Sequence, residues 1–205
     1  MAVVGYQANI KKSGTSTSFT SESMTVTSGN TYQIDDSAKQ VFNFNSTFTF
    51  YEDAVAISNS DIDTIDYMYG KVTFLTSKTG SITVDGAYYP MANIAGAYQA
   101  TQNTTNQVLN TTSFENQGYV EKLPNQKDIT VTCTRFDDLS KDFQDILEGG
   151  NSIVIEFLPS TGNGNRGWYV LDSASQNLDM SNVIEESLSF QLTDNKNILK
   201  TFSRQ

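Results

Sequence analysis

Apolar and polar residues alternate most regularly in the second half of the chain. Ile129, Val131 and Cys133 alternate with threonines, which is the pattern of a strand with one buried face. A short apolar run predicts a further strand over 153–158. The alternation returns near the end, at Leu188, Phe190 and Leu192. These segments predict a mostly β fold.

One helix is predicted between these strands, from Leu139 to Leu147. Its apolar residues recur at i, i+4, i+7 and i+8, which places them on one helical face. Asp137 and Asp138 would favour the start of the helix by capping it and by interacting with its dipole. The paired glycines at 149 and 150 would end it.

The first half of the chain predicts a series of short strands joined by turns. Phe42, Phe44, Phe48 and Phe50 share one parity, so a strand over 47–51 would present aromatic side chains on one face. Residues 78–80 are expected to connect two neighbouring strands as a hairpin. Further strands are expected at 2–10, 19–27, 32–34, 71–75 and 81–84. In the second half, 160–167 is expected to be a loop before a strand that begins at Trp168, a core or interface anchor.

Residues 91–118 interrupt this pattern. Between Tyr98 and Gly118 the only charged residue is Glu115, and most positions are Gln, Asn, Thr or Ser. A connector this long and polar is unusual, so it is either mobile or ordered by another chain. We favour ordering on assembly.

Composition and charge narrow the range of partners. A chain of 205 residues can form one well-packed all-β domain or two small ones. Its formal net charge is −10, which argues against tight wrapping of nucleic acid, because phosphate contacts need clustered Lys and Arg. The charge is compatible with a surface that DNA passes without sticking, although an acidic balance is also ordinary for soluble proteins.

A single cysteine, Cys133, excludes an intrachain disulfide bond. Its place on the apolar phase of its strand predicts a small buried residue rather than a reactive thiol. The first residues lack the pattern of a signal peptide, and no run approaches the roughly 18 apolar residues of a membrane span. A soluble intracellular product is expected.

Catalytic candidates are confined to carboxylates, because the chain has no histidine. This absence excludes Ser-His-Asp and Cys-His catalysis and histidine-bearing zinc sites. The run of 61–66 hints at a calcium loop but lacks the glycine and distal glutamate of an EF-hand. We predict no catalytic, cofactor-binding or metal-binding residues and no cofactor, because a solvated acidic loop explains the carboxylates equally well. These carboxylates are Glu52, Asp53, Asp61, Asp63 and Asp66.

Taken in order, these segments resemble the tail tube (major tail) proteins of long-tailed bacteriophages. The likeness covers roughly residues 60–193, and the order and spacing of its elements carry it. The first 30 residues and the tail with Lys196, Lys200 and Arg204 depart from the pattern. In the first half these elements are 70–74 and 81–88. In the second half they are Thr112–Phe114, the spaced residues Gly118, Glu121 and Leu123, the strand that ends at Arg135 and Phe136, and the helix that ends in Gly-Gly. The hairpin near 162–167 and the segment 186–192 complete the set.

This resemblance implies a β-sandwich or partly closed β-barrel flanked by one α-helix, with a long assembly loop. It implies a single domain over 1–205, an inter-ring loop at 91–118 and arms at 1–30 and 194–205. In this family, hexameric rings stack into a tube, and strands of every subunit join around a lumen whose wall is commonly electronegative. The implied role is structural and not enzymatic, in the virion tail and with assembly in the host cytoplasm. Implied partners are copies of itself, tape measure, terminator and tip proteins, and DNA in passage, without a membrane.

The assembly interpretation also bears on sheet edges. The segments 48–51 and 187–192 carry few Pro or Lys residues that would protect an exposed edge, so pairing with neighbours would satisfy them. Two other classes of protein stay open. Tyr, Trp and Asn residues suggest a binding module such as an adhesin or a carbohydrate-binding β-sandwich, and the carboxylates suggest a hydrolase.

Overall fold

The computed structural model describes residues 9–111, 121–136, 142–158, 163–177, 184–193 and 200–203. Its contacts divide the chain into two compact units, and the single domain expected over 1–205 stays a prediction. Unit 1 comprises Met1–Asn93, Val154–Gly167 and Leu199–Gln205, and unit 2 comprises Ile94–Ile153 and Trp168–Ile198. The expected mostly β fold with one α-helix is confirmed for the described residues.

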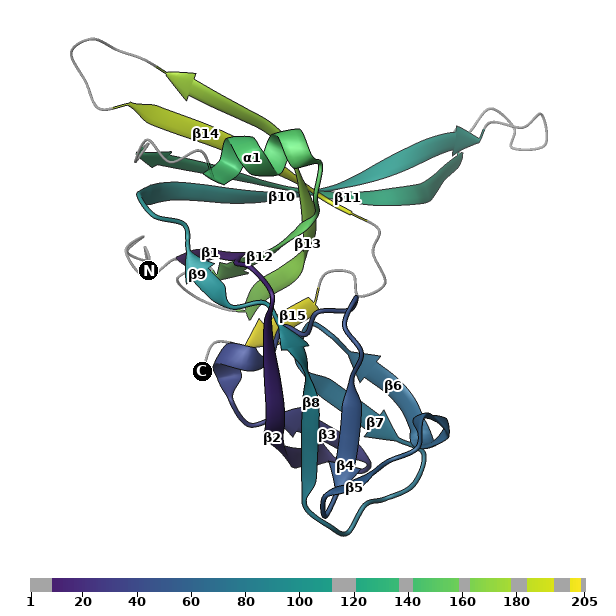
Figure 1. Cartoon of the computed structure of the whole chain (residues 1–205). Helices are drawn as coiled ribbons and strands as arrows, with labels where there is room; N and C mark the ends of the chain where they lie inside the picture. The colour runs from purple at the N-terminus through teal and green to yellow at the C-terminus, as the bar shows by residue number, and fades with distance from the viewer. Residues whose placement is uncertain are drawn as a thin grey trace, which may run out of the picture. The chain divides into compact units, whose positions relative to one another are not determined.

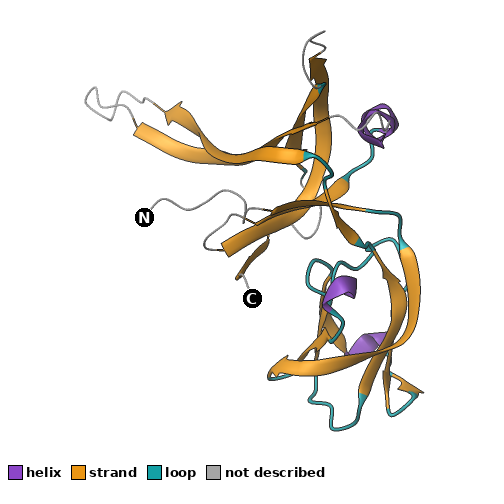
Figure 2. Cartoon of the chain, turned by 90° about the vertical axis from the view of Figure 1, so that its left-hand side faces the viewer, coloured by secondary structure: helices purple, strands orange, loops and turns teal. Residues whose placement is uncertain are grey.

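A seven-stranded antiparallel sheet forms most of unit 1, in the order β5-β4-β8-β2-β3-β7-β6. Figure 2 shows this sheet curling around its own interior. The curled sheet encloses an aromatic core in which the rings of Phe42 and Phe48 stack with centroids 4.7 Å apart. Its strands are β2 (Thr17–Ser28), β3 (Thr31–Ile34), β4 (Thr49–Glu52), β5 (Val55–Ala56), β6 (Ile62–Asp66), β7 (Lys71–Phe74) and β8 (Ile82–Tyr88). Two 3-10 turns, Ser37–Lys39 and Asn59–Asp61, lie between them.

Strands β1 (Asn9–Ser13) and β9 (Met91–Asn93) bracket the curled sheet in sequence. They pair with each other, and Ser13 stands opposite Met91. The Gly14 N–H then donates to the Pro90 carbonyl over 2.8 Å. Residues 14–90 therefore leave and return at one point, as an insertion between two paired strands.

The rest of unit 1 adds strand β12 (Ile153–Leu158), which pairs with β1, and β15 (Lys200–Ser203), which pairs with the start of β13 (Asn163–Asn177). Here a buried ion cluster forms around Glu156, which is 3% exposed. The carboxylate accepts from Arg166 over 2.6 Å and lies 3.0 Å from Lys11 Nζ. Arg166 also donates to the Met68 carbonyl over 2.6 Å, so it links β13 to the inserted sheet.

Unit 2 contains a sheet in the order β10-β11-β14-β13. Helix α1 (Asp142–Gly149) packs on one face of this sheet (Figure 1), where the rings of Phe143 and Phe190 lie 6.0 Å apart. The strands are β10 (Ala97–Thr111), β11 (Glu121–Phe136) and β14 (Glu185–Leu192), together with the second part of β13. None of the helices in the described part of the chain is long and apolar enough to cross a membrane.

Several strands agree with the sequence predictions, and three details differ. Residues 78–80 were expected to form a hairpin, but β7 and β8 are not neighbours, because β2 and β3 lie between them in the sheet. The loop expected at 160–167 is shorter, since β13 already begins at Asn163. The described helix begins at Asp142, and its predicted capping residues Asp137 and Asp138 lie outside the described residues.

Candidate assembly interface

The longest sheet edge in the described chain is strand β10, which ends the order of unit 2. It runs for 15 residues and contains no proline and no charged residue. Natural edge strands are usually short, or carry Lys or Pro, because a row of unpaired backbone groups is a template for pairing with another chain. Strand β10 has none of these protections.

This edge was not the one that the sequence suggested. Segment 48–51 contributes to β4, which is paired on both sides, by β8 and β5. Segment 187–192 belongs to β14, which lies between β11 and β13. The prediction of open edges at these two segments is therefore wrong: both have few protecting residues because they are interior strands.

The segment 97–111, part of the expected assembly loop, is instead a strand of the chain's own sheet. It pairs with β11 from Ala97 opposite Arg135 to Thr111 opposite Glu121. The prediction that another chain would be needed to order this part is therefore corrected. Residues 112–118 of the expected loop lie outside the described residues.

Beyond the sheet, β10 and β11 continue as a two-stranded ribbon, which Figure 1 shows reaching past β14. Strand β14 pairs with β11 only from Thr130 to Phe136, whereas β10 and β11 stay paired to Thr111 and Glu121. A two-stranded ribbon alone is at best marginally stable in water. The ribbon and the edge together form a backbone surface that a third strand could complete.

The opposite end of the β10–β11 pair, away from the ribbon, is held by a tight turn. Gly96 has φ +73°, and a Cβ atom there would lie 2.6 Å from the Phe136 carbonyl oxygen, so only glycine fits. The Phe136 N–H donates to the Gly96 carbonyl over 3.0 Å. The Tyr98 ring stacks on Phe136 with centroids 4.7 Å apart, although each is nearly half exposed, at 48% and 44%.

A buried ion pair fixes β11 against β14 on the helix side of the sheet. Arg135 Nε lies 2.5 Å from a Glu186 carboxylate oxygen, and the two residues are 2% and 4% exposed. The guanidinium also sits 4.8 Å from the centre of the Phe143 ring, so it contacts the helix. Sequence reasoning placed Arg135 in the strand but gave no signal for this pair, because its partner is 51 residues away.

Cys133 lies on the same covered face. Its side chain is buried, as predicted, and burial raises the pKa of the thiol to about 11. The thiolate is therefore scarce at neutral pH, which makes this cysteine chemically quiet. Trp168 is also buried, at 4% exposure, which fits the core role expected for it.

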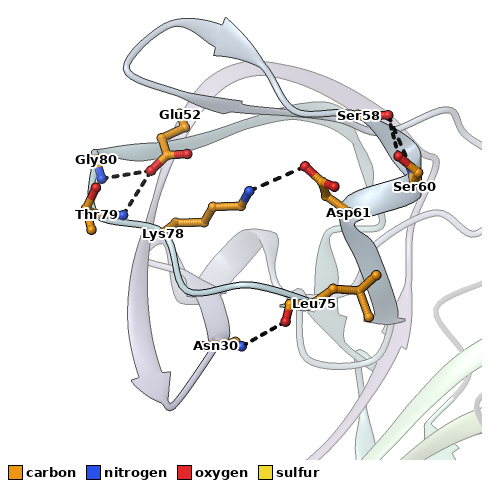
Figure 3. A network of polar contacts seen from close by, with 9 residues as sticks. All are labelled: Asn30, Glu52, Ser58, Ser60, Asp61, Leu75, Lys78, Thr79 and Gly80. Carbon is orange, nitrogen blue, oxygen red and sulfur yellow. Dashed lines mark hydrogen bonds and ion pairs between the residues drawn. The ribbon is translucent and has the colours of Figure 1, made fainter.

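The carboxylates singled out in the sequence lie in the inserted sheet of unit 1, where they bind its own loops (Figure 3). Glu52 accepts from the backbone N–H groups of Thr79 and Gly80, which hold the pKa of its carboxyl below the usual value. Asp61 lies 3.6 Å from Lys78 Nζ. These contacts account for the crossing of residues 75–81 from β7 to β8.

Two more of these carboxylates also accept hydrogen bonds from backbone N–H groups. Asp53 accepts from the Ser81 N–H, and Asp66 accepts from the Met68 N–H. Asp63 is exposed on β6. Within the described residues, no group of three or more acidic, histidine or cysteine side chains is placed to hold a metal ion. Four of the five carboxylates thus bind groups of their own sheet and its loops, and Asp63 faces solvent.

Comparisons with known proteins give partial likenesses only. No family description and no curated protein matches this chain. Among solved structures, it is similar to a chain from the tail of an empty GTA particle, with TM-score 0.47 and 15% identity over 56% of this chain and 87% of that one. A chain from the virion of a native gene transfer agent particle has TM-score 0.46 and 15% identity over 56% of this chain and 89% of that one. The likeness is to tail particles. Because the likeness covers only 56% of this chain, the proposed function is argued from the geometry of the chain itself.

Proposed function

We propose that this chain is a structural, non-enzymatic subunit of a phage-type tail tube. Copies assemble into hexameric rings, and the rings stack around a lumen through which DNA passes. The observation that carries the proposal is the unprotected 15-residue edge of β10, at the end of the sheet in unit 2. A neighbouring copy that pairs with this edge removes its liability to aggregate, and a closed ring of copies leaves no free edge.

The ribbon of β10 and β11 supplies the contact between rings. It extends past β14 and lacks a third strand in the described chain, so it gains most from a partner. Segment 91–118, which includes β10, is thus the inter-ring element. The proposed arms comprise the residues of 1–30 and 194–205 that lie outside β1, β2 and β15, since these strands pair within the chain.

The other partners follow from the same role. A tube subunit meets tape measure protein in the lumen and terminator and tip proteins at the ends. It belongs to the virion tail, is assembled in the host cytoplasm, and needs no membrane or cofactor. The net charge of −10 keeps passing DNA from binding tightly, since DNA binding depends on clustered cations.

The two rival functions have less support. A carboxylate-based hydrolase needs two acidic groups facing a cleft, whereas Glu52 and Asp53 bind backbone N–H groups and Asp61 pairs with Lys78. A carbohydrate-binding module uses exposed aromatic side chains; Trp168 is buried, and the exposed rings of Tyr98 and Phe136 stack on each other. A glycan array tests this second alternative, because a tube subunit should show no saturable binding.

Electron microscopy of the purified chain tests the proposal directly. We expect rings or tubes that grow with protein concentration. Monomers alone at every concentration and salt condition, in protein that is folded by circular dichroism, would overturn the proposal. A saturable glycan ligand for that monomer would favour the binding module instead.

A further inference from the structure

The curled sheet of unit 1 is an insertion with a core of its own. The chain enters it after Gly14 and leaves it at Pro90, and a hydrogen bond joins these two residues. In the described chain, the seven strands of this sheet pair with one another and not with strands of the other sheet. The buried residues of its core, from Phe19 to Val84, all lie within the insertion. A segment with its own core can fold as a unit, so residues 14–90 have what a separate module needs.

The crossing between this insertion and the other strands of unit 1 is short. Pairing between β1 and β9 ends at Ser13, and pairing between β2 and β8 begins at Thr17. The connecting residues, 14–16 and 89–90, belong to no strand, and Gly14 is exposed. Hinges in proteins are a few residues of this kind, at the ends of elements, which absorb changes of backbone angle. The crossing by itself therefore leaves the orientation of the insertion free to change.

Arg166, near the start of β13, forms a second link to the insertion. Its Nη1 donates to the Met68 carbonyl over 2.6 Å, and its guanidinium lies 5.3 Å from the centre of the Tyr69 ring. Its Nε and Nη2 both donate to one oxygen of Glu156, over 3.0 Å and 2.6 Å. Arg166 is 7% exposed. One buried guanidinium thus joins strands outside the insertion to a turn inside it.

Both sides of this link are held in place by further contacts. Glu156 stands opposite Lys11 in the register of β1 and β12, and its other carboxylate oxygen lies 3.0 Å from Lys11 Nζ. In the insertion, the Met68 N–H donates to Asp66 Oδ1 over 3.1 Å, which holds the turn between β6 and β7. Arginine suits this position, because its planar guanidinium donates in several fixed directions. The link therefore joins two structures that are already ordered.

We infer that Arg166 is the latch of the inserted sheet: it fixes the orientation of residues 14–90 on strands β1, β12 and β13. Without this latch, the sheet stays folded around its own core and turns about the crossing at 14–16 and 89–90. Arg166 is a positioning residue, because it acts through the Met68 carbonyl. The inference concerns unit 1 alone and does not depend on assembly into a tube, so its failure would leave the proposed function untouched.

The test variant must break the latch without leaving a buried charge unpaired. Loss of Arg166 alone would leave Glu156 without its partner, which could unfold unit 1. The test variant is therefore Arg166→Met, Glu156→Gln. Lys11 can turn to water, since its side chain is 31% exposed. The matched control is Arg135→Met, Glu186→Gln, which removes a buried arginine–glutamate pair of unit 2.

Spin labels at Ser77→Cys and Asn93→Cys report the orientation of the insertion. Both positions are exposed, and Ser77 lies within the insertion whereas Asn93 lies outside it, in β9. Cys133 is buried and contributes little background. Pulsed electron paramagnetic resonance, on labelled chains diluted with unlabelled chains, measures the distance between the two labels of one copy. We expect a narrow distance distribution in the labelled parent and in the control, and a broad one in the test variant.

Hydrogen exchange of the same proteins shows whether the insertion stays folded. Amides of β2, β7 and β8 should exchange in the test variant as they do in the parent, because the core is intact. The Gly14 amide, which donates to Pro90 at the crossing, should exchange faster.

Four results would overturn the inference. A narrow distribution in the test variant would mean that another contact holds the sheet. A broad distribution in the parent would mean that Arg166 does not fix it. Broadening in the control would show an effect that is not specific to the latch. Fast exchange throughout β2, β7 and β8 of the test variant would mean that the insertion does not fold without its link to β13.

Discussion

The seven-stranded sheet of unit 1 ends in strands of 2 and 5 residues, whereas the sheet of unit 2 ends in a strand of 15. In the sheet of unit 1, the end strand β5 has only 2 residues with which to pair another chain, and the end strand β6 carries Asp63 and Asp66. Both features discourage the addition of another strand. Strand β10 has neither. This difference supports the proposal that β10 pairs with a neighbouring copy.

The two sheets also differ in how much of their surface they bury. The curled sheet closes around an aromatic core, in which Phe42, Phe48 and Phe50 pack against one another. The sheet of unit 2 has one face covered by α1 and one face open. An antiparallel sheet can keep one face in water. The curled sheet therefore encloses its own core, whereas the described part of unit 2 has one exposed sheet edge, β10, and one open sheet face.

Proline in the β10 edge should give the largest effect, because it removes a backbone donor that no side chain replaces. Neighbouring N–H groups in a strand point to opposite sides, so of Asn103→Pro and Thr104→Pro one affects the ladder with β11 and the other the free edge. We expect the variant that removes an N–H group of the free edge to give a folded chain that forms no rings. Circular dichroism and electron microscopy measure the two properties.

The control for this experiment is Ala56→Pro, at the short edge of the curled sheet. It should leave assembly unchanged, since β5 has no role in pairing between copies. Rings formed equally by both β10 variants would contradict the assignment of the edge. Loss of rings in Ala56→Pro would show that the curled sheet also contributes to assembly.

Matched truncations of two buried phenylalanines should separate the units. Phe143 is 1% exposed in unit 2 and Phe42 is 0% exposed in unit 1. Each change to alanine should cost about 3–5 kcal/mol of unfolding free energy in its own unit, from lost burial and the cavity left behind. Fluorescence of Trp168, which belongs to unit 2, follows urea unfolding. Phe143→Ala should shift this transition strongly and Phe42→Ala much less. Equal shifts would mean that the units unfold together.

Acid should weaken unit 1 through Glu156. Burial alone would raise the pKa of this carboxyl, but Arg166 and Lys11 outweigh it and hold the pKa below its ordinary value of 4.5. A lowered folded-state pKa stabilises the fold above the unfolded pKa, and this stability is lost as the pH falls from about 4.5 through the folded value.

Urea unfolding followed by far-ultraviolet circular dichroism between pH 6 and pH 3 measures this loss. Glu156→Gln should be less stable at pH 6, because Arg166 and Lys11 lose their charged partner, and should change less with pH. The same pH dependence in Glu156→Gln and wild type would assign the acid sensitivity to other carboxylates.

The smallest effect is expected at the loop shown in Figure 3. Asp61→Asn removes the ion pair with Lys78, but the Asp61 side chain is 48% exposed, and exposed pairs contribute about 0–1 kcal/mol. Thermal unfolding should therefore change little, and rings should form as in wild type. A loss of several kcal/mol would show that this loop holds the curled sheet closed more firmly than its exposure suggests.

Two of the strands were predictable from local patterns in the sequence. Ile129, Val131 and Cys133 are buried in β11 as expected, because one buried face imposes a period of two residues on the side chains. Segment 153–158 coincides with β12, whose first four residues are all buried, so a continuous apolar run rather than an alternation predicted it. The helix was also predictable, since Phe143 is its buried residue.

Neighbour relations were harder to predict. The sequence predicts open edges at segments with few Pro or Lys residues, yet β4 and β14 are interior strands. The long sheet edge is the polar strand β10. A strand without protecting residues has the same composition whether its partner comes from its own chain or from another. The expected hairpin at 78–80 failed for a related reason, because β2 and β3 come between β7 and β8.

The sequence by itself determined that the chain is mostly β with one helix, lacks histidine chemistry, and buries Cys133 and Trp168. These properties depend on composition and on local periodicity, which a strand or a helix imposes on its own residues. Only the tertiary structure decided which strand is the edge, which carboxylates are engaged with backbone N–H groups, and which residues of β11 and β14 stand opposite each other. Those facts depend on register between strands far apart in the sequence, such as Thr130 and Gln191, 61 residues apart, and the energy that sets this register comes from contacts that form only on folding.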